Sequence, residues 1–174
     1  GEGVYIDKDL TIDFNGCYYS MDKAYDGAAM LIARDTTVTL KNSKPAKEGK
    51  LCITYSNADG VCSANFSNLI KNYGTLYVQD VFLNGNNTFA DFTTSTLFNA
   101  GTVHLGSGTK VTARTLALEN EGTLTKDKSV EVAAPSGFHF DEATGELEHH
   151  SYTSTKYGAT VYEVAYTLHT CECG

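Results

Sequence analysis

Asn72-Tyr73-Gly74-Thr75-Leu76 returns twice along the chain, as Asn99-Ala100-Gly101-Thr102-Val103 and as Asn120-Glu121-Gly122-Thr123-Leu124. Each copy follows a short apolar segment and reads Asn-x-Gly-Thr followed by an apolar residue. The asparagines are 27 and then 21 residues apart. A motif that recurs at intervals of this size predicts a repeat architecture in which each copy marks a corner, with loops of unequal length between corners.

The residue types of this corner indicate a structural role. Glycine adopts a left-handed backbone conformation without a Cβ clash, so the three glycines are expected in that conformation. The three asparagines are expected to lie one above another, with their side-chain amides hydrogen-bonded as a ladder along the stack. The predicted corner ladder consists of Asn72, Gly74, Asn99, Gly101, Asn120 and Gly122.

The segments after the corners alternate between apolar and polar residues with the period of two that is typical of half-buried strands. Two looser copies of the repeat precede the clear ones, at residues 4–10 and 31–38. Short strands between Gly, Asn, Asp and Ser clusters, with only two prolines and no long helical period, predict an all-β fold. Of the two all-β candidates, a sandwich of hairpins and a solenoid, the repeated corner favours the solenoid. One outward-facing column of this solenoid would contain Thr11, Thr39, Tyr77, His104 and Thr125.

Three segments look like the coil motifs of a known group of proteins: Leu10-Thr11-Ile12-Asp13-Phe14-Asn15-Gly16, Val38-Thr39-Leu40-Lys41-Asn42-Ser43 and Asn72-Tyr73-Gly74-Thr75-Leu76. On these residues the chain resembles the pectate-lyase-like parallel β-helix domains of bacterial secreted and cell-surface, adhesin-like proteins. The likeness covers residues 4–132 and implies a right-handed, single-stranded parallel β-helix. It does not select a function, because this fold carries lyases, hydrolases, adhesins and passive stalks alike.

The repeat ends before Pro135, a residue that is unsuited to a central strand. We therefore expect β-helix coils over residues 1–134 and a C-terminal β-hairpin-like extension or cap over residues 135–174, truncated at its end. A hairpin is expected to turn at Thr144-Gly145, and the extension would cover the open end of the stack or pack on its side. A later strand is expected to carry four apolar residues on one face, namely Tyr162, Val164, Tyr166 and Leu168.

The charge of the chain argues against polyanionic partners. Thirteen Lys and Arg against twenty-one Asp and Glu give a net charge of −8, so we expect no nucleic acid partner. No run of 18 or more apolar residues is present, and no membrane-spanning helix is expected. The chain opens on Gly1-Glu2-Gly3 without a methionine, which suggests that an export signal has been left out. The predicted location is extracellular or at the cell surface.

The chain has an odd number of cysteines, Cys17, Cys52, Cys62, Cys171 and Cys173. In an exported protein, Cys52 and Cys62 are the best candidates for a disulfide, because Asp59-Gly60 between them can turn the chain back. The alternative is a pair of reduced cysteines that face the core or the solvent.

Two groups of side chains are candidate binding sites. Tyr77 and His104, one coil apart, would present an aromatic patch for a sugar ring, which Tyr73 at the corner would extend. The alternative is ordinary packing of surface aromatics between coils. Near the C-terminus, His169, Cys171 and Cys173 alternate and would project to one side of a strand, as zinc ligands do. His149 and His150 are possible further partners, but a two-residue cysteine spacing is not the usual zinc motif.

No motif indicates catalysis. The acids Asp80, Asp91 and Asp127 have no spacing that would pair them as glycoside hydrolysis requires. No phosphate-binding loop, dinucleotide-binding glycine pattern or nucleophile elbow is present, so no cofactor is expected. The leading hypothesis is a non-catalytic extracellular spacer or adhesin segment with weak carbohydrate binding. The alternative is a fragment of a carbohydrate-active β-helix, a polysaccharide lyase or hydrolase. Expected partners are glycans, host or cell-surface proteins, and neighbouring domains of the same polypeptide.

Overall fold

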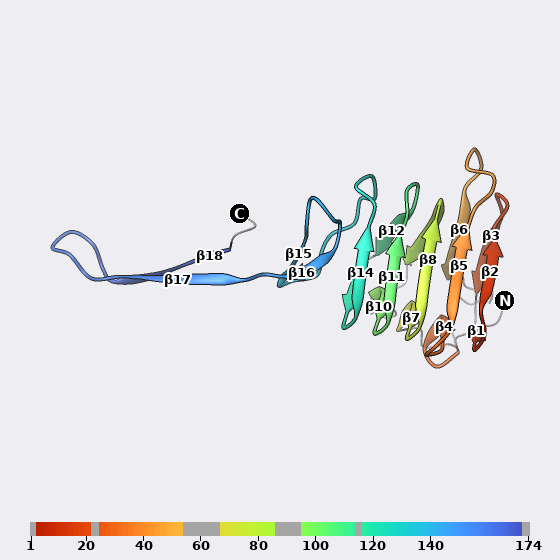
Figure 1. Cartoon of the computed structure of the whole chain (residues 1–174), viewed down its shortest axis with the longest axis horizontal. Coiled ribbons are helices and arrows are strands. Elements are labelled where there is room, and N and C mark those ends of the chain that lie inside the picture. Colours follow the sequence, from red (N-terminus) through yellow and green to blue (C-terminus); the bar gives the residue numbers. More distant parts are fainter. Residues whose placement is uncertain (1–2, 22–24, 54–66, 86–94, 114–115, 172–174) are drawn as a thin grey trace, which may run out of the picture.

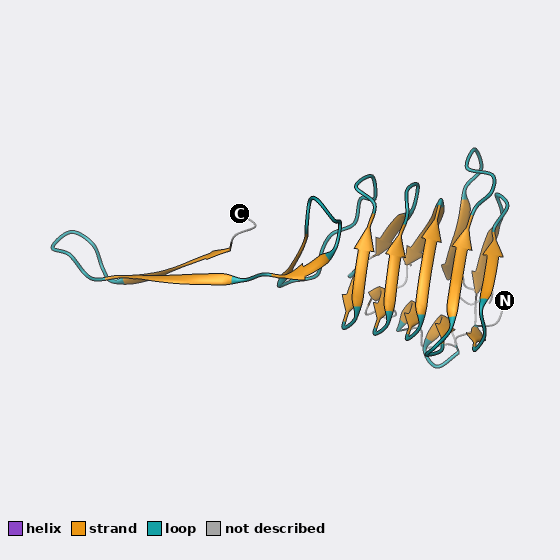
Figure 2. Cartoon of the chain, in the orientation of Figure 1, coloured by secondary structure: helices purple, strands orange, loops and turns teal. Residues whose placement is uncertain are grey.

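The computed structural model describes residues 3–21, 25–53, 67–85, 95–113 and 116–171. These residues form strands, turns and loops, and no helix (Figure 2). Strands β1 to β14 lie in three parallel sheets, and every third strand along the chain joins the same sheet (Figure 1). The all-β prediction and the parallel β-helix are confirmed. Within the described ranges there is no helix long and apolar enough to cross a membrane.

Each coil of the helix contributes one strand to each sheet in turn. Sheet 1 consists of β1 (Val4–Ile6), β4 (Ala28–Ile32), β7 (Asn68–Asn72), β10 (Ser95–Asn99) and β13 (Leu118–Asn120). Sheet 2 consists of β2 (Leu10–Asp13), β5 (Thr37–Lys41), β8 (Thr75–Gln79), β11 (Thr102–Leu105) and β14 (Thr123–Lys126). Sheet 3 consists of β3 (Tyr18–Met21), β6 (Gly49–Ile53), β9 (Val81–Gly85) and β12 (Lys110–Ala113).

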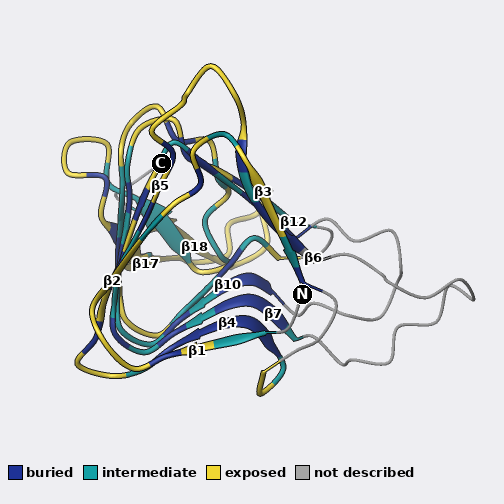
Figure 3. Cartoon of the chain, turned by 90° about the vertical axis from the view of Figure 1, so that its right-hand side faces the viewer, coloured by how far each residue is buried: buried dark blue, intermediate teal, exposed yellow. Residues whose placement is uncertain are grey.

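The three sheets surround one hydrophobic core, which the view along the stack shows as an inner lining of buried residues (Figure 3). The alternation within sheet 2 sets this arrangement: Val38 and Leu40 point inward and are fully buried, while Thr39 between them points outward. Burying a Leu or Ile side chain stabilises the fold by about 1.5–3 kcal/mol, and each coil buries such side chains in the core. Fully buried members include Ile32, Leu51, Leu69, Leu83 and Leu97.

The glycines of the repeated corner differ from the prediction. The glycines with positive φ among the described residues are Gly16, Gly27, Gly108, Gly137 and Gly145. The corner glycines Gly74, Gly101 and Gly122 are therefore not left-handed, and that expectation is wrong. They are required for space instead, because a Cβ on Gly101 would meet the carbonyl oxygen of Gly74, and one on Gly122 the carbonyl oxygen of Gly101. Stacked corners approach too closely for any side chain there.

A C-terminal hairpin covers the last coil. Strands β15 (Phe138–Phe140) and β16 (Leu147–His149) pair antiparallel, with Gly145 left-handed in the predicted turn. The backbone N–H of Lys126, at the end of β14, donates to the carbonyl of Gly145 at 2.9 Å. Leu147 joins the hydrophobic core, and the Lys126 ammonium lies 5.1 Å from the Phe140 ring centre. We call this hairpin the cap.

A second hairpin projects away from the coils (Figure 1). Its strands, β17 (Tyr152–Tyr157) and β18 (Tyr166–Cys171), pair antiparallel and are exposed along almost their whole length. We call this hairpin the arm. Tyr162 and Val164 were expected on the strand of Tyr166, but they lie in the connection before β18 and are 95% and 83% exposed. That part of the prediction is wrong.

Candidate functional site

The outer face of sheet 2 carries the predicted column of side chains. Strand pairing places Thr11, Thr39, Tyr77, His104 and Thr125 in one register across all five strands. A second column runs beside it and consists of Thr37, Thr75, Thr102 and Thr123. The outer face of this sheet is therefore rich in hydroxyl groups, and an aromatic pair interrupts one column.

The two rings of that pair stack on each other. The ring centres of Tyr77 and His104 are 4.8 Å apart, with 14° between the ring planes. The Nδ1 atom of His104 lies 2.6 Å from the hydroxyl of Thr125, which fixes the imidazole on its other side. Because the facing sides of the rings cover each other, a sugar cannot stack between them. Tyr77 is 43% exposed, so part of its side chain is accessible to a ligand.

Tyr73 contacts a different neighbour. Its ring lies edge-on to Phe98 of β10, with the centres 5.9 Å apart. Phe98 faces outward from sheet 1, in register with Lys71 and Glu119. The contacts of Tyr73 are thus with the sheet 1 side of the corner, and the contacts of Tyr77 are with sheet 2.

The corner asparagines form a hydrogen-bonded ladder inside the coils. The side-chain amide of Asn72 donates to the Oδ1 of Asn99 at 2.8 Å, and that of Asn99 donates to the Oδ1 of Asn120 at 2.7 Å. Asn72 and Asn99 are fully buried. Their amides also bond backbone groups of the corners, so the polar atoms of this ladder are used in the scaffold.

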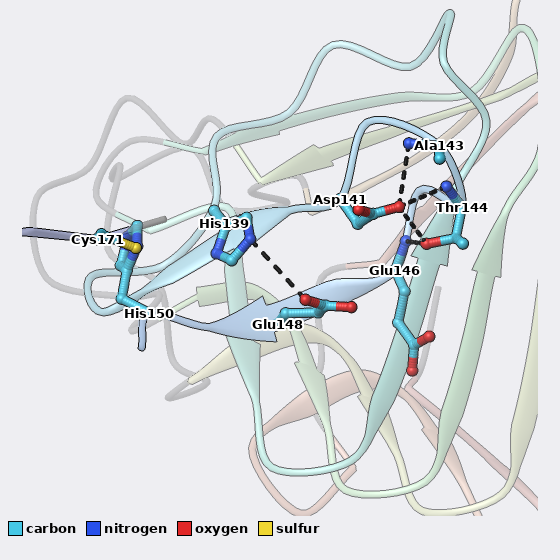
Figure 4. Close-up of polar contacts among 8 residues, drawn as sticks. All are labelled: His139, Asp141, Ala143, Thr144, Glu146, Glu148, His150 and Cys171. Carbon is cyan, nitrogen blue, oxygen red and sulfur yellow. Dashed lines mark hydrogen bonds and ion pairs between the residues drawn. The ribbon is translucent and has the colours of Figure 1, made fainter. Parts of the chain in front are cut away.

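A half-open pocket of about 570 Å³ lies where the cap meets the arm. It is lined by His139, Phe140, Asp141, Glu142, Glu148, Ser151 and Cys171. Figure 4 shows the imidazole of His139 between the carboxylate of Glu148 on one side and the pair of His150 and Cys171 on the other. Imidazole, carboxylate and thiol groups thus lie close together at this pocket.

The contacts within the pocket form two pairs. The Nε2 of His139 lies 3.9 Å from a carboxylate oxygen of Glu148, its cross-strand neighbour in the cap. The Nδ1 of His150 lies 3.2 Å from the Sγ of Cys171. The imidazoles of His139 and His150 stack with their centres 5.1 Å apart and so connect the pairs. The Nδ1 of His139 is buried and has no hydrogen-bond partner.

Asp141 at the rim of the pocket serves the turn of the cap. Its Oδ1 accepts hydrogen bonds from the backbone N–H of Thr144 at 2.6 Å and of Ala143 at 3.0 Å, and from the Thr144 hydroxyl. These hydrogen bonds lower the pKa of Asp141, and the bond from the Thr144 backbone N–H contributes most to this shift. Hydrogen bonds likewise lower the pKa of Asp13 and of Asp127 in other turns. A general acid needs the opposite shift, so these three carboxyl groups are unsuited to that role.

The structure separates the residues of the predicted zinc site. His169 lies on β18, where its Nδ1 is 2.8 Å from the hydroxyl of Ser154. Cys171 contacts His150 instead, and Cys173 lies outside the described residues. His149 packs its ring against Phe138, with centres 4.0 Å apart. Over the described ranges, no three His, Cys, Asp or Glu side chains converge as they stand on one metal position.

The predicted disulfide involves one described residue. Cys52 on β6 is buried, and this burial raises the pKa of its thiol. Cys62 lies outside the described residues, so the pairing of these cysteines stays a prediction.

Sequence reasoning did not find the contacts on the outer face of sheet 3. There Tyr18, Lys50 and Phe82 follow one another in register. The Lys50 ammonium lies 5.4 Å from the Tyr18 ring centre and 5.2 Å from that of Phe82. The sequence signal is one residue in each of three coils, which becomes visible only when the coil register is known. Cation–π contacts of this kind stabilise the stack by about 0.5–1 kcal/mol each at exposed sites.

No family model matches the chain, and no match is found among curated proteins or solved structures. Function is therefore argued from the residues and their geometry.

Proposed function

We propose that the chain is a non-catalytic extracellular β-helix module that acts as a spacer or adhesin segment of a bacterial surface protein. The observation that carries this proposal is the outer face of sheet 2. One column of threonines runs in register over successive coils, and a second column of threonines beside it is interrupted by Tyr77 and His104. Such a face exposes hydroxyl groups and few charges. Inside the coils, the asparagine ladder and the continuous core join successive levels, as a rigid spacer requires.

The electrostatics favour the non-catalytic role. A polysaccharide hydrolase needs one carboxyl group with a raised pKa and a second one at a set distance. The resolved shifts of carboxyl pKa in the described chain, at Asp13, Asp127 and Asp141, are all downward. Placement outside the cell rests on the resemblance to bacterial surface proteins.

Carbohydrate binding on sheet 2 is the second part of the proposal. The stack of Tyr77 on His104 leaves the hydroxyl of Tyr77 and the neighbouring threonine hydroxyls for hydrogen bonds to sugars. A surface of this kind binds weakly, because it encloses little of the ligand. A glycan array probed with the wild type and with Tyr77→Ala tests this part. We expect a signal that the substitution reduces; an unchanged signal would assign the binding to another face.

A carbohydrate-active β-helix is the alternative function. The observation that favours it is the C-terminal pocket, where Glu142 and Glu148 lie with His139. Incubation of the chain with a panel of polysaccharides, followed by assays for new reducing ends and for unsaturated products, separates the two functions. The non-catalytic role predicts no product above the blank. If the wild type forms product and Glu148→Gln does not, the enzymatic function would be supported and the spacer role rejected.

A further inference from the structure

Four side chains of the types that bind zinc lie at the pocket between cap and arm: three of them line it, and the fourth, His150, contacts one of these three, Cys171. His139 lies on β15, Glu148 on β16, His150 just after β16, and Cys171 at the end of β18. The four residues come from both hairpins, so a metal held among them would join the arm to the cap. Figure 4 shows His139 at the centre of this group.

His150 and Cys171 lie close to the spacing of two ligands of one tetrahedral ion. The Nδ1 of His150 and the Sγ of Cys171 are 3.2 Å apart. With Zn–S near 2.3 Å and Zn–N near 2.0–2.1 Å, two such ligands at a tetrahedral angle lie about 3.6 Å apart. An increase of about 0.4 Å in this distance therefore accommodates the ion.

His139 is the candidate for a third ligand. One nitrogen of its ring, Nε2, faces the Glu148 carboxylate at 3.9 Å. The other, Nδ1, is buried without a hydrogen-bond partner, although a buried nitrogen without a partner is costly. In zinc sites, the ring nitrogen of a histidine ligand that does not bind the ion usually donates to a carboxylate. Glu148 faces Nε2 from 3.9 Å, beyond hydrogen-bond distance, and would serve in this way once His139 turns toward the ion.

We propose that this pocket is a Zn²⁺ site in which His139, His150 and Cys171 are the protein ligands and Glu148 positions His139. A set of imidazoles and a thiolate favours zinc over the hard cations Mg²⁺ and Ca²⁺. The imidazoles now stack with centres 5.1 Å apart, so His139 must turn its side chain to bring Nδ1 to the ion. Metal binding commonly drives such local rearrangement, and a water completes the fourth position.

Titration of the reduced full chain with Co²⁺, a spectroscopic substitute for Zn²⁺, tests the site. We expect one Co²⁺ per chain and a thiolate-to-cobalt charge-transfer band, which Zn²⁺ displaces. Cys171→Ser should abolish the band, and His150→Ala and His139→Ala should each weaken Zn²⁺ binding at least tenfold. The matched control is Cys17→Ser, which changes an exposed cysteine of the first coil and should leave the band unchanged.

Three outcomes would overturn the proposal: no charge-transfer band in the wild type, full affinity in His139→Ala, or a band lost in Cys173→Ser and kept in Cys171→Ser. Glu148→Gln should weaken binding by about 10- to 100-fold with the cobalt spectrum unchanged, because it alters a supporting residue and not a ligand. An unchanged affinity would contradict its positioning role.

A measurement on the wild type guards against variants that do not fold. Zn²⁺ should protect Cys171 from alkylation, as read by peptide mass spectrometry, while Cys17 stays reactive in the same sample. Equal alkylation of Cys171 with and without Zn²⁺ would overturn the site.

Discussion

Replacement of Asn99 by leucine tests the corner ladder at its centre. Asn99 accepts hydrogen bonds from the Asn72 amide at 2.8 Å and from the Gly101 backbone N–H at 3.0 Å. It donates to the Oδ1 of Asn120 at 2.7 Å and to the carbonyl of Thr123 at 2.9 Å. Leucine fills a similar volume but leaves these groups without their partner. The Gly101 N–H and the Thr123 carbonyl would lose their hydrogen-bond partner. Each unsatisfied backbone group costs about 1–3 kcal/mol when buried and less when partly exposed, so the free energy of unfolding should fall by about 2–3 kcal/mol.

Urea denaturation followed by circular dichroism measures this loss. With an m-value of about 2–3 kcal/mol/M, the midpoint of Asn99→Leu should fall by about 1 M while m stays constant. Asn120→Leu is the matched control, because Asn120 ends the ladder, is only half-buried, and loses fewer bonds. We expect a loss of about 1 kcal/mol for this control. A midpoint of Asn99→Leu equal to that of the wild type, or a larger loss in the control, would refute the ladder as a source of stability.

Other predictions concern space, pH and thiol reactivity. Gly101→Ala should destabilise the fold by about 1–3 kcal/mol in the same urea assay, because its Cβ would meet the backbone of the preceding corner, whereas Gly158→Ala meets nothing and should be neutral. The lowered pKa of Asp141 means that its contribution to stability is present above the unfolded value near 3.8 and is lost as the pH falls through the folded pKa. The melting temperature of the wild type should therefore fall more in acid than that of Asp141→Asn, and parallel curves would contradict this. In the reduced chain, Cys52 should alkylate more slowly at neutral pH than Cys17, because burial raises the pKa of the Cys52 thiol; equal rates by mass spectrometry would count against its burial.

The coils were predictable because their signals are local. An Asn-x-Gly-Thr corner and the period-two pattern that follows it, as in Leu76-Tyr77-Val78, place one buried and one exposed column without any knowledge of the neighbouring coils. The conformation of the corner glycines was not predictable in this way. Gly101 is glycine because of the carbonyl oxygen of Gly74, a residue 27 positions earlier. A single copy of the motif carries no information about that approach.

Strand pairing explains the error in the arm. The apolar alternation through Tyr162, Val164 and Tyr166 continues in the sequence, but a strand forms only where a partner is present. β17 offers six residues, Tyr152–Tyr157, and β18 pairs with all six from Tyr166 onward. Residues 158–165 connect the two strands, so the apolar alternation in this segment has no partner strand and forms no sheet.

The sequence could predict only part of the pocket. The predicted turn at Thr144-Gly145 brings the two strands of the cap together but does not give their register. A two-residue turn there would place His139 opposite His150, whereas the structure pairs His139 with Glu148 across the loop 141–146. The contact of His150 with Cys171 could not be predicted, because it depends on how the arm leaves the cap. The aromatic patch shows the same limit. The register predicts that Tyr77 neighbours His104, but not that their rings cover each other.

The ladder itself occupies only part of the stack, and the reason lies in the earlier corners. In register with Asn72 stand Ile32 and Ile6, which are buried and apolar. The corner after Ile32 contains four residues, 33–36, where the later corners contain two, and it turns with Asp35 in the left-handed conformation. That longer corner contains a hydrogen bond of its own, because the Thr36 hydroxyl donates to the carbonyl of Arg34 at 3.3 Å. In the two-residue corners Asn72 and Asn99 accept from the backbone N–H groups of Gly74 and Gly101, so the asparagine supplies a partner that a short corner lacks. The longer corner bonds within itself, and an isoleucine occupies the position before it.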